Sequence, residues 1–289
     1  MIIKKLITPL FNHLTAGTSI KSLQSKIVQI NSENLYPIPD YIKESSNNKD
    51  DIINVVNEYK KLASLYNLEY IALKLSSLNF DPLHINQVVK TLIDNNKQIL
   101  IDAENVINQP LINDITNELI KTYNKSYTQI FKTYQMYRKD QLKMLVDDLK
   151  KYPKIGIKLV RGAYYNEDKN TNLLFTNKQE TDEAYSNAID VIFDKKNNHL
   201  KSFICTHNSN DINKMIELYN KHPDLYCYNI YHASLYGFIK EDTKRIIDSG
   251  IKTFKYLPYG EIEDAVPYLV RRIYENPKVL YYYLDKVKR

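Results

Sequence analysis

The sequence is poor in the residue types that mark several common protein classes. Its 289 residues include no tryptophan, six glycines and two cysteines. Cys205 and Cys227 lie in apolar runs and have neither disulfide-framework nor zinc-ligand spacing, so we expect two buried thiols in a reducing compartment and no metal site. No apolar run approaches the length needed to cross a bilayer, so no membrane-spanning helix is predicted.

Positive charge exceeds negative charge without gathering anywhere along the chain. The formal net charge is +6, from 40 Lys and Arg against 34 Asp and Glu. Nucleic-acid-binding proteins usually carry a dense basic block interleaved with aromatic residues, and the sequence has none. We therefore expect a solvated, lysine-rich surface and no nucleic-acid partner.

Short β-rich runs alternate with longer amphipathic stretches. Residues 84–97 are typical of the latter, because their apolar side chains recur at the spacing of one helix face. No glycine-rich dinucleotide fingerprint follows a strand, which favours a closed eight-stranded barrel over an open doubly wound sheet. We predict one α/β domain, residues 1–289, folded as a (βα)8 TIM-type barrel. The predicted strands are Leu35–Tyr41, Tyr70–Leu78, Gln98–Glu104, Ile130–Gln135, Gly156–Gly162, Lys201–Thr206, Leu225–Tyr231 and Thr253–Leu257.

Polar and ionisable residues gather where the predicted strands end. In a parallel barrel these ends meet at one face, where active sites are found. Each residue alone has an ordinary explanation: Lys74 can extend its amine to solvent, and Asp102 can cap a helix. Six strands with the same feature favour a site. The residues are Lys74 and Ser76, Asp102 and Glu104, Tyr134 and Gln135, Lys158 and Arg161, Thr206 and His207, and Tyr256.

Two adjacent arginines follow the last predicted strand. Arg271 and Arg272 lie on a helix after a Pro-Tyr-Gly turn, and two guanidinium forks near a helix start suit a carboxylate. The helical periodicity of this segment argues against a carboxylate site. If the apolar stripe packs on the barrel strands, both arginines face solvent. That stripe is formed by Ile262, Val266, Leu269 and Ile273.

Several motifs resemble those of the proline dehydrogenase family and occur in the family's order. The most specific are KLVRGAYY (158–165), KYLPYG (255–260) and YLVRRIYEN (268–276). The others, which extend the resemblance over nearly the whole chain, are LITPLFNHLTAG (6–17), ALKLSSL (72–78), LIDAEN (100–105), FKTYQMY (131–137) and THN (206–208).

The resemblance implies a distorted (βα)8 barrel with a short N-terminal helical segment and a bound FAD. It further implies oxidation of L-proline to 1-pyrroline-5-carboxylate, the first step of proline catabolism, by hydride transfer to flavin N5. The electrons would pass to a quinone. Lys158 and the KYLPYG motif are closest to eukaryotic members, whereas bacterial members usually have arginine at the position of Lys158.

The resemblance also implies roles for individual residues. Asp102, Lys158 and Tyr256 are the expected catalytic residues, and Lys74, Arg271 and Arg272 the expected ligands of the substrate carboxylate. For the arginines to reach the substrate, the last helix must lie across the barrel mouth, where Glu275 would help to hold Arg271 in place. The expected cofactor-binding residues are Ala103, Gln135, Arg161, Gly162, Ala163, Tyr164, Thr206 and His207.

Two alternatives stay open on the sequence. A hydroxyproline dehydrogenase tends to carry a smaller residue at the position of Tyr256, so this tyrosine favours proline. A non-catalytic barrel would not be expected to keep Asp102, Lys158 and the arginine pair. The strand-7 region matches the family loosely, with Ser234 where a longer polar side chain is common.

The cellular location and the membrane association are also open on the sequence. Resemblance to eukaryotic members suggests mitochondria. Only a few residues precede the first expected helix, and this suggests the cytoplasm instead. A quinone acceptor implies peripheral association with a membrane, although no anchoring segment is evident.

Overall fold

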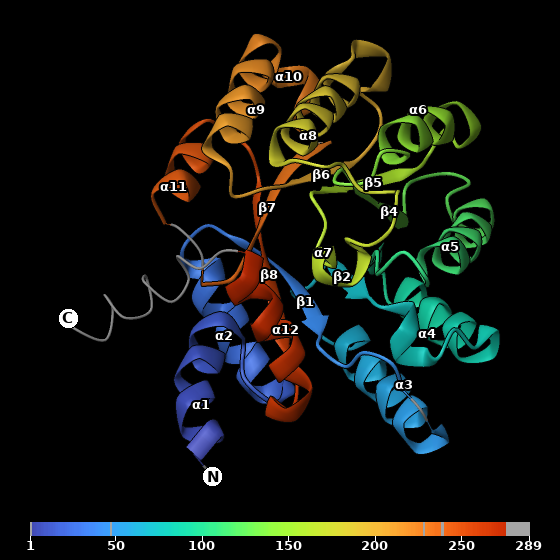
Figure 1. Cartoon of the computed structure of the whole chain (residues 1–289), viewed down its shortest axis with the longest axis vertical. Coiled ribbons are helices and arrows are strands. Elements are labelled where there is room, and N and C mark those ends of the chain that lie inside the picture. Colours follow the sequence, from blue (N-terminus) through green and yellow to red (C-terminus); the bar gives the residue numbers. More distant parts are fainter. Residues whose placement is uncertain (1, 47, 228, 238–239, 276–289) are drawn as a thin grey trace.

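The computed structural model describes residues 2–46, 48–227, 229–237 and 240–275, which form a closed barrel of parallel strands (Figure 1). The strands follow one another around the barrel in sequence order, and β8 pairs with β1. This confirms the predicted TIM-type fold. The strands are β1 (Tyr36–Tyr41), β2 (Tyr70–Leu73), β3 (Gln98–Ile101), β4 (Ile130–Gln135), β5 (Gly156–Val160), β6 (Ser202–Cys205), β7 (Ile230–Leu235) and β8 (Thr253–Tyr259).

Helices surround the barrel, and two of them precede its first strand, as expected. Several begin at a side chain that accepts a hydrogen bond from a backbone N–H of the first turn, as Asn48, Asp81 and Asn177 do. The helices are α1 (Ile2–Leu14), α2 (Ile20–Ser32), α3 (Lys49–Ala63), η1 (Leu75–Leu78), α4 (Pro82–Asp94), α5 (Gln109–Tyr123), α6 (Gln141–Lys151), α7 (Tyr165–Asp168), α8 (Lys178–Phe193), η2 (Lys195–Asn197), α9 (Ser209–Lys221), α10 (Pro223–Tyr226), α11 (Lys240–Asp248) and α12 (Ile262–Glu275).

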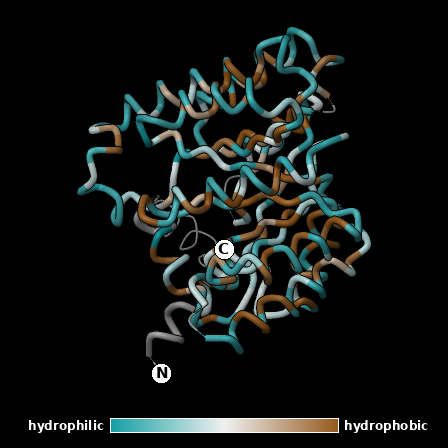
Figure 2. The backbone as a smooth tube through the Cα atoms, turned by 90° about the vertical axis from the view of Figure 1, so that its right-hand side faces the viewer, coloured by the Kyte–Doolittle hydropathy of each residue, from teal (hydrophilic) through white to brown (hydrophobic). Residues whose placement is uncertain are grey.

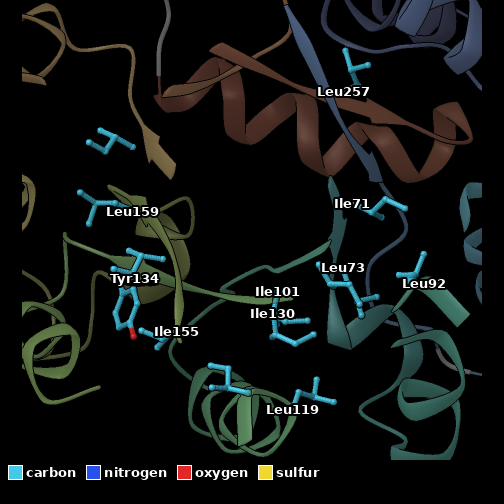
Figure 3. Close-up of a cluster of buried hydrophobic side chains, with 14 of the residues drawn as sticks. Ile71, Leu73, Leu92, Ile101, Leu119, Ile130, Tyr134, Ile155, Leu159 and Leu257 are labelled. Atoms are coloured by element: carbon cyan, nitrogen blue, oxygen red, sulfur yellow. The ribbon is translucent and has the colours of Figure 1, made fainter. Parts of the chain in front are cut away.

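The larger part of the core lies between the strands and the helices. Figure 3 shows side chains of this cluster, including Ile71, Ile101 and Ile130 from the strands and Leu92 and Leu119 from the helices. All of them are buried, because one face of each strand and one stripe of each helix is apolar. Figure 2 shows hydrophilic and hydrophobic residues alternating along the outer helices. Within the described ranges, no helix is long and apolar enough to cross a membrane.

A second apolar cluster fills the lower part of the barrel lumen, toward the N-terminal ends of the strands. The ring centroids of Tyr70 and Phe203 are 4.9 Å apart, and those of Phe203 and Phe254 are 5.0 Å apart, with the rings edge to face. Gly156 makes room for this packing, because a Cβ atom there would lie 2.5 Å from the ring of Phe131. We call these rings the aromatic layer: Tyr70, Phe131, Phe203, Tyr231 and Phe254.

The structure corrects the predicted bounds of several strands: β3 ends at Ile101, β5 ends at Val160 and β8 extends to Tyr259, and the largest corrections concern β7 and β2. The prediction placed strand 7 at Leu225–Tyr231, but β7 begins at Ile230, because Pro223 starts the short helix α10 instead. The Tyr226 hydroxyl anchors that helix by donating to the carbonyl of Phe193 at 2.7 Å. The strand predicted to extend to Leu78 ends at Leu73, where the chain turns into η1.

Candidate functional site

A layer of polar and charged side chains lies above the aromatic layer, toward the C-terminal ends of the strands. Every second residue of a strand faces the lumen. On β8 the lumen-facing residue after Phe254 is therefore Tyr256, and along β2 the positions of Tyr70 and Ala72 lead to Lys74. These side chains line a cavity of about 740 Å³. We call the group the charged layer: Asp40, Lys74, Asp102, Lys158 and Tyr256.

Asp102 is the centre of the charged layer. Its Oδ1 accepts a hydrogen bond of 2.6 Å from Lys158 Nζ and another of 2.6 Å from the Tyr256 hydroxyl. Lys158 Nζ also lies 3.1 Å from that hydroxyl and 4.4 Å from the centroid of the tyrosine ring. Burial alone would raise the pKa of Asp102, but the ammonium groups of Lys158 and Lys74 hold it below its usual value.

Asp40 belongs to this layer and was not predicted from the sequence. It ends the lumen-facing positions of β1 and pairs with Lys74, whose Nζ also lies 3.7 Å from Asp102 Oδ2. Burial raises the pKa of Asp40 against the pull of Lys74. Burial would lower the pKa of Lys74, but Asp40 and Asp102 raise it. Two carboxylates thus balance two ammonium groups. The search for polar residues at the ends of the predicted strands did not include the first strand. Applied to that strand, it would have found Asp40.

Helix α12 packs mainly against the N-terminal helix α1, and the only strand residue in its apolar cluster among the described residues is Leu235, at the end of β7. Its apolar residues Ala265, Tyr268 and Leu269 pack against residues of α1 and Ile42, and Figure 1 shows α12 beside the N-terminal helices. The buried residues differ from the predicted stripe, because Ala265 and Tyr268 are buried while Val266 is only half-buried. Tyr268 lies one helical turn before Arg271, and it lines the cavity as well as packing in this cluster. Arg271 accordingly lines the cavity.

Within the described part of the chain, Arg271 makes one ion pair and leaves one buried donor without an acceptor. Its Nη2 lies 2.5 Å from Glu44 Oε1, and its Cζ lies 5.0 Å from the centroid of the Tyr164 ring. Its Nε–H is buried and has no acceptor among the described residues. Glu44, which follows β1, was not predicted from the sequence. The side chains of Arg272 and Glu275 lie outside the described part of the chain.

The residues expected to bind the cofactor line the same cavity as the charged layer. They come from the ends of β3 to β6 and from the loops that follow, and they are Ala103, Gln135, Arg161, Gly162, Ala163, Tyr164, Thr206 and His207. The structure therefore brings together every expected site residue whose side chain it describes.

Arg161 is the most constrained of these side chains. Its Nη2 lies 3.0 Å from Asp182, and its Nη1 lies 2.6 Å from Asp211 and 3.0 Å from the Thr206 hydroxyl. Burial would lower the pKa of Arg161, but these carboxylates raise it. Because the guanidinium is held from three sides, its position is set before any ligand binds. Both carboxylates come from helices and follow no strand end, so the strand-end pattern in the sequence could not indicate them.

Gly162 adopts φ +129°, a conformation that favours glycine. A Cβ atom at this position would lie 2.2 Å from the ring of Tyr137. The close approach that the glycine permits in this structure is therefore to Tyr137. The hydroxyl of that tyrosine donates to Asp168 at 2.5 Å, and Asp168 also accepts from the backbone N–H of Val106 at 2.9 Å. These contacts fix the loop that follows β5 over the cavity.

The architecture and the motifs together have counterparts among known proteins. The family described as proline dehydrogenase matches residues 23–280. The chain belongs to the proline dehydrogenase family. It is 31% identical over 218 residues to the mitochondrial proline dehydrogenase 1 of Dictyostelium discoideum, covering 66% of this chain and 38% of that protein.

Two further family relatives extend the comparison. The carbapenem antibiotics biosynthesis protein CarD of Pectobacterium carotovorum is 26% identical, covering 90% of this chain and 77% of that protein. Proline utilization A (PutA) of Bdellovibrio bacteriovorus has the same fold, with a TM-score of 0.84 at 19% identity, over 95% of this chain and 33% of that one. The chain thus spans about a third of the length of the mitochondrial and PutA relatives.

Proposed function

We propose that this protein is an FAD-dependent proline dehydrogenase that oxidises L-proline to 1-pyrroline-5-carboxylate and passes the electrons to a quinone. Two observations support the proposal: the chain belongs to the family, and one cavity is lined both by the charged layer and by the residues expected to bind the cofactor. The observation that carries the substrate assignment is Arg271, which lines that cavity and whose buried Nε–H has no acceptor among the described residues. We also propose that residues 1–289 act as one domain.

The cavity fits a flavin dinucleotide in size and chemistry. Its volume of about 740 Å³ lies within the range of small-molecule and cofactor sites. Gln135, Arg161, Thr206 and His207 supply hydrogen-bonding groups suited to the flavin edge, the ribityl hydroxyls and the phosphates. Gln135 Nε2 is held in place by donating to the carbonyl of Glu104 at 2.8 Å. The flavin, when bound, supplies the hydride acceptor.

The charged layer and α12 would bind and orient proline. Arg271 presents a donor that has no acceptor among the described residues, and a substrate carboxylate would satisfy it. Lys74 would support the same carboxylate, and we assign Arg272 to it as well. The Tyr256 ring, fixed by its hydrogen bond to Asp102, would pack against the substrate ring. Lys158 would place positive charge beside the flavin.

Anaerobic reduction of the flavin tests the proposal. Purified protein is saturated with FAD and mixed without oxygen with L-proline or 4-hydroxy-L-proline, while flavin absorbance is followed. L-proline should bleach the flavin with the higher kcat/KM. Faster bleaching by hydroxyproline would reassign the substrate, and failure to bind FAD or to bleach would leave a non-catalytic barrel. Re-oxidation by a soluble quinone analogue tests the acceptor.

A further inference from the structure

Three ion pairs lie in the wall of the cavity before any ligand binds. They are Lys158 with Asp102, Lys74 with Asp40, and Arg271 with Glu44. Each of these cations already has a carboxylate partner, so a substrate carboxylate adds a further negative charge to a buried site. Burying that charge is unfavourable unless another charge in the site is neutralised.

L-Proline brings a proton that can neutralise such a charge. At neutral pH its ring nitrogen is an ammonium group, since amines of this kind have a pKa of about 10. Oxidation to 1-pyrroline-5-carboxylate requires the nitrogen to give up this proton. Hydride leaves the neighbouring ring carbon only when the nitrogen lone pair can form the new C=N bond. The cavity must therefore provide a base.

Asp40 is the carboxylate of the cavity best suited to take a proton. The carboxylates that line the cavity are Asp40, Glu44 and Asp102. Asp102 Oδ1 already accepts two hydrogen bonds of 2.6 Å, and, against the effect of burial, Lys158 and Lys74 hold the pKa of Asp102 below its usual value. Glu44 is held by the guanidinium group of α12. Asp40 is 3% exposed, and burial raises its pKa despite the pull of Lys74.

Asp40 also lies close to the expected place of the substrate nitrogen. The proposed function puts the substrate carboxylate beside Lys74, and the nitrogen of an α-amino acid is bonded to the carbon that carries this carboxylate. Asp40 contacts the same ammonium group. We propose that Asp40 is the catalytic base: its carboxylate takes the proton, the electron pair of the broken N–H bond stays on nitrogen, and the substrate carboxylate replaces Asp40 as the partner of Lys74. This inference rests on the proposed function, because it takes the substrate to be L-proline.

The proton transfer leaves the charges of the cavity balanced. A buried ammonium group and a buried carboxylate become two neutral groups, and burial favours the neutral form of each. The ammonium groups of Lys74 and Lys158 also disfavour a positive charge on the substrate nitrogen. Lys74 then pairs with the substrate, and Lys158 and Arg271 keep the partners that they have in the free protein.

Flavin reduction by Asp40→Asn tests the assignment. Asparagine has nearly the size of aspartate and keeps an oxygen for Lys74, but it cannot take the proton. Anaerobic rapid mixing of the FAD-loaded variant with L-proline should show reduction about 100-fold slower than in the unaltered protein at pH 7. The rate should rise about tenfold per pH unit up to pH 9 in the variant alone, because proline that is already neutral needs no base. Asp148, which is buried and pairs with Lys132 at 2.7 Å outside the cavity, provides the control, and Asp148→Asn should behave as the unaltered protein.

Binding of an anion without the proton gives a second measurement. (S)-Tetrahydro-2-furoate has an oxygen in place of the ring nitrogen of proline, so Asp40 must take its proton from solution. Calorimetry in buffers of different ionisation enthalpy should show proton uptake by the unaltered FAD-loaded protein. Because the anion raises the pKa of Asp40 further, affinity should fall by up to about tenfold per unit as the pH rises from 5 to 8. Asp40→Asn should bind the anion more tightly at pH 8 and without proton uptake.

The pH dependence can be traced to Asp40. The other charged and titratable groups that face it are Lys74, Asp102, Lys158, Tyr59 and Tyr256. Burial raises the pKa of both tyrosines well above its usual value, and the pKa of Lys74 is raised and that of Asp102 lowered by their ion pairs, so these four groups keep their charge between pH 5 and 9. A pH dependence that came from other groups lining the cavity would persist in Asp40→Asn and would overturn the assignment.

Three results would assign Asp40 a structural role only. They are a rate loss in Asp40→Asn that is equal at pH 7 and pH 9, weaker binding of the anion by that variant, and absence of proton uptake by the unaltered protein. The last result needs no variant and decides the matter if Asp40→Asn does not fold. In all three cases proline still reduces the flavin of the unaltered protein. An FAD-loaded protein that proline does not reduce would overturn the proposed function as well.

Discussion

The lower and upper parts of the barrel lumen belong to one barrel, share the strands β2 and β8, and have opposite chemistry. The aromatic layer packs its rings edge to face or tilted, and the ammonium group of Lys201 lies 5.9 Å from the centroid of the Tyr70 ring. The charged layer lies one lumen position further along β8, two further along β2, and toward the C-terminal ends of β1, β3 and β5. It pairs carboxylates with ammonium groups in the wall of the cavity. One layer is satisfied by its own packing, and the other borders space that a ligand can fill.

The two layers divide stability and function between the two ends of the strands, with packing toward the N-terminal ends and the cavity toward the C-terminal ends. Close-packed rings stabilise the barrel and form a dry floor beneath the site. Above that floor, charges interact more strongly than they would in water, so Asp102 can fix Lys158 and Tyr256 before a ligand arrives. Substitutions in the aromatic layer should therefore reduce stability, and substitutions around the cavity should reduce ligand binding.

The largest expected effect comes from opening the aromatic layer. Phe203 is fully buried, so Phe203→Ala should lower the free energy of unfolding by about 3–5 kcal/mol through lost burial and a cavity. Tyr66, which is 98% exposed, provides the control: Tyr66→Ala should change stability by less than about 0.5 kcal/mol. Urea denaturation measures both. A Phe203→Ala protein of normal stability that bound proline poorly would break the comparison.

Acid should destabilise the fold through His232, a buried histidine that points outward from the barrel. Burial lowers the pKa of His232, on the outer face of β7, from 6.5 to about 4. The unfolded chain then binds a proton that the folded protein does not, so stability is lost as the pH falls from 6.5 toward 4, by about 3 kcal/mol in all. Urea denaturation at several pH values should show this loss, and His232→Gln should flatten it. An unchanged pH profile in the variant would assign the acid sensitivity to the charged layer instead.

A smaller free-energy effect is expected at the cavity mouth. Arg271→Met should raise the KM for proline by about 10- to 100-fold, the equivalent of one charge-assisted contact of about 1.5–3 kcal/mol. Arg245 is an exposed arginine on α11 and supplies the control, because Arg245→Met removes the same charge far from the cavity. Steady-state kinetics measures both variants. Equal KM values for the two would place the carboxylate away from α12.

Much of this arrangement could be predicted from the sequence, because strand-end polarity depends only on local pattern. Lys74, Asp102 and Lys158 were found by that rule, and the structure places them together. The orientation of α12 could not be derived in this way. Periodicity identifies the apolar face of a helix but not the element that buries it, and here α1 buries it. The start of β7 was missed because one apolar run is divided between α10 and the strand.

The most direct test of the account compares L-proline with L-prolinamide as anaerobic reductants of the FAD-loaded protein. The two molecules share the ring and the reacting carbon, and the amide lacks the negative charge that Arg271 and Lys74 would hold. Rapid mixing should show flavin reduction by proline, with reduction by the amide about 100-fold slower at equal, subsaturating concentration. Equal rates for the two would contradict the assignment of the cavity mouth as a carboxylate site.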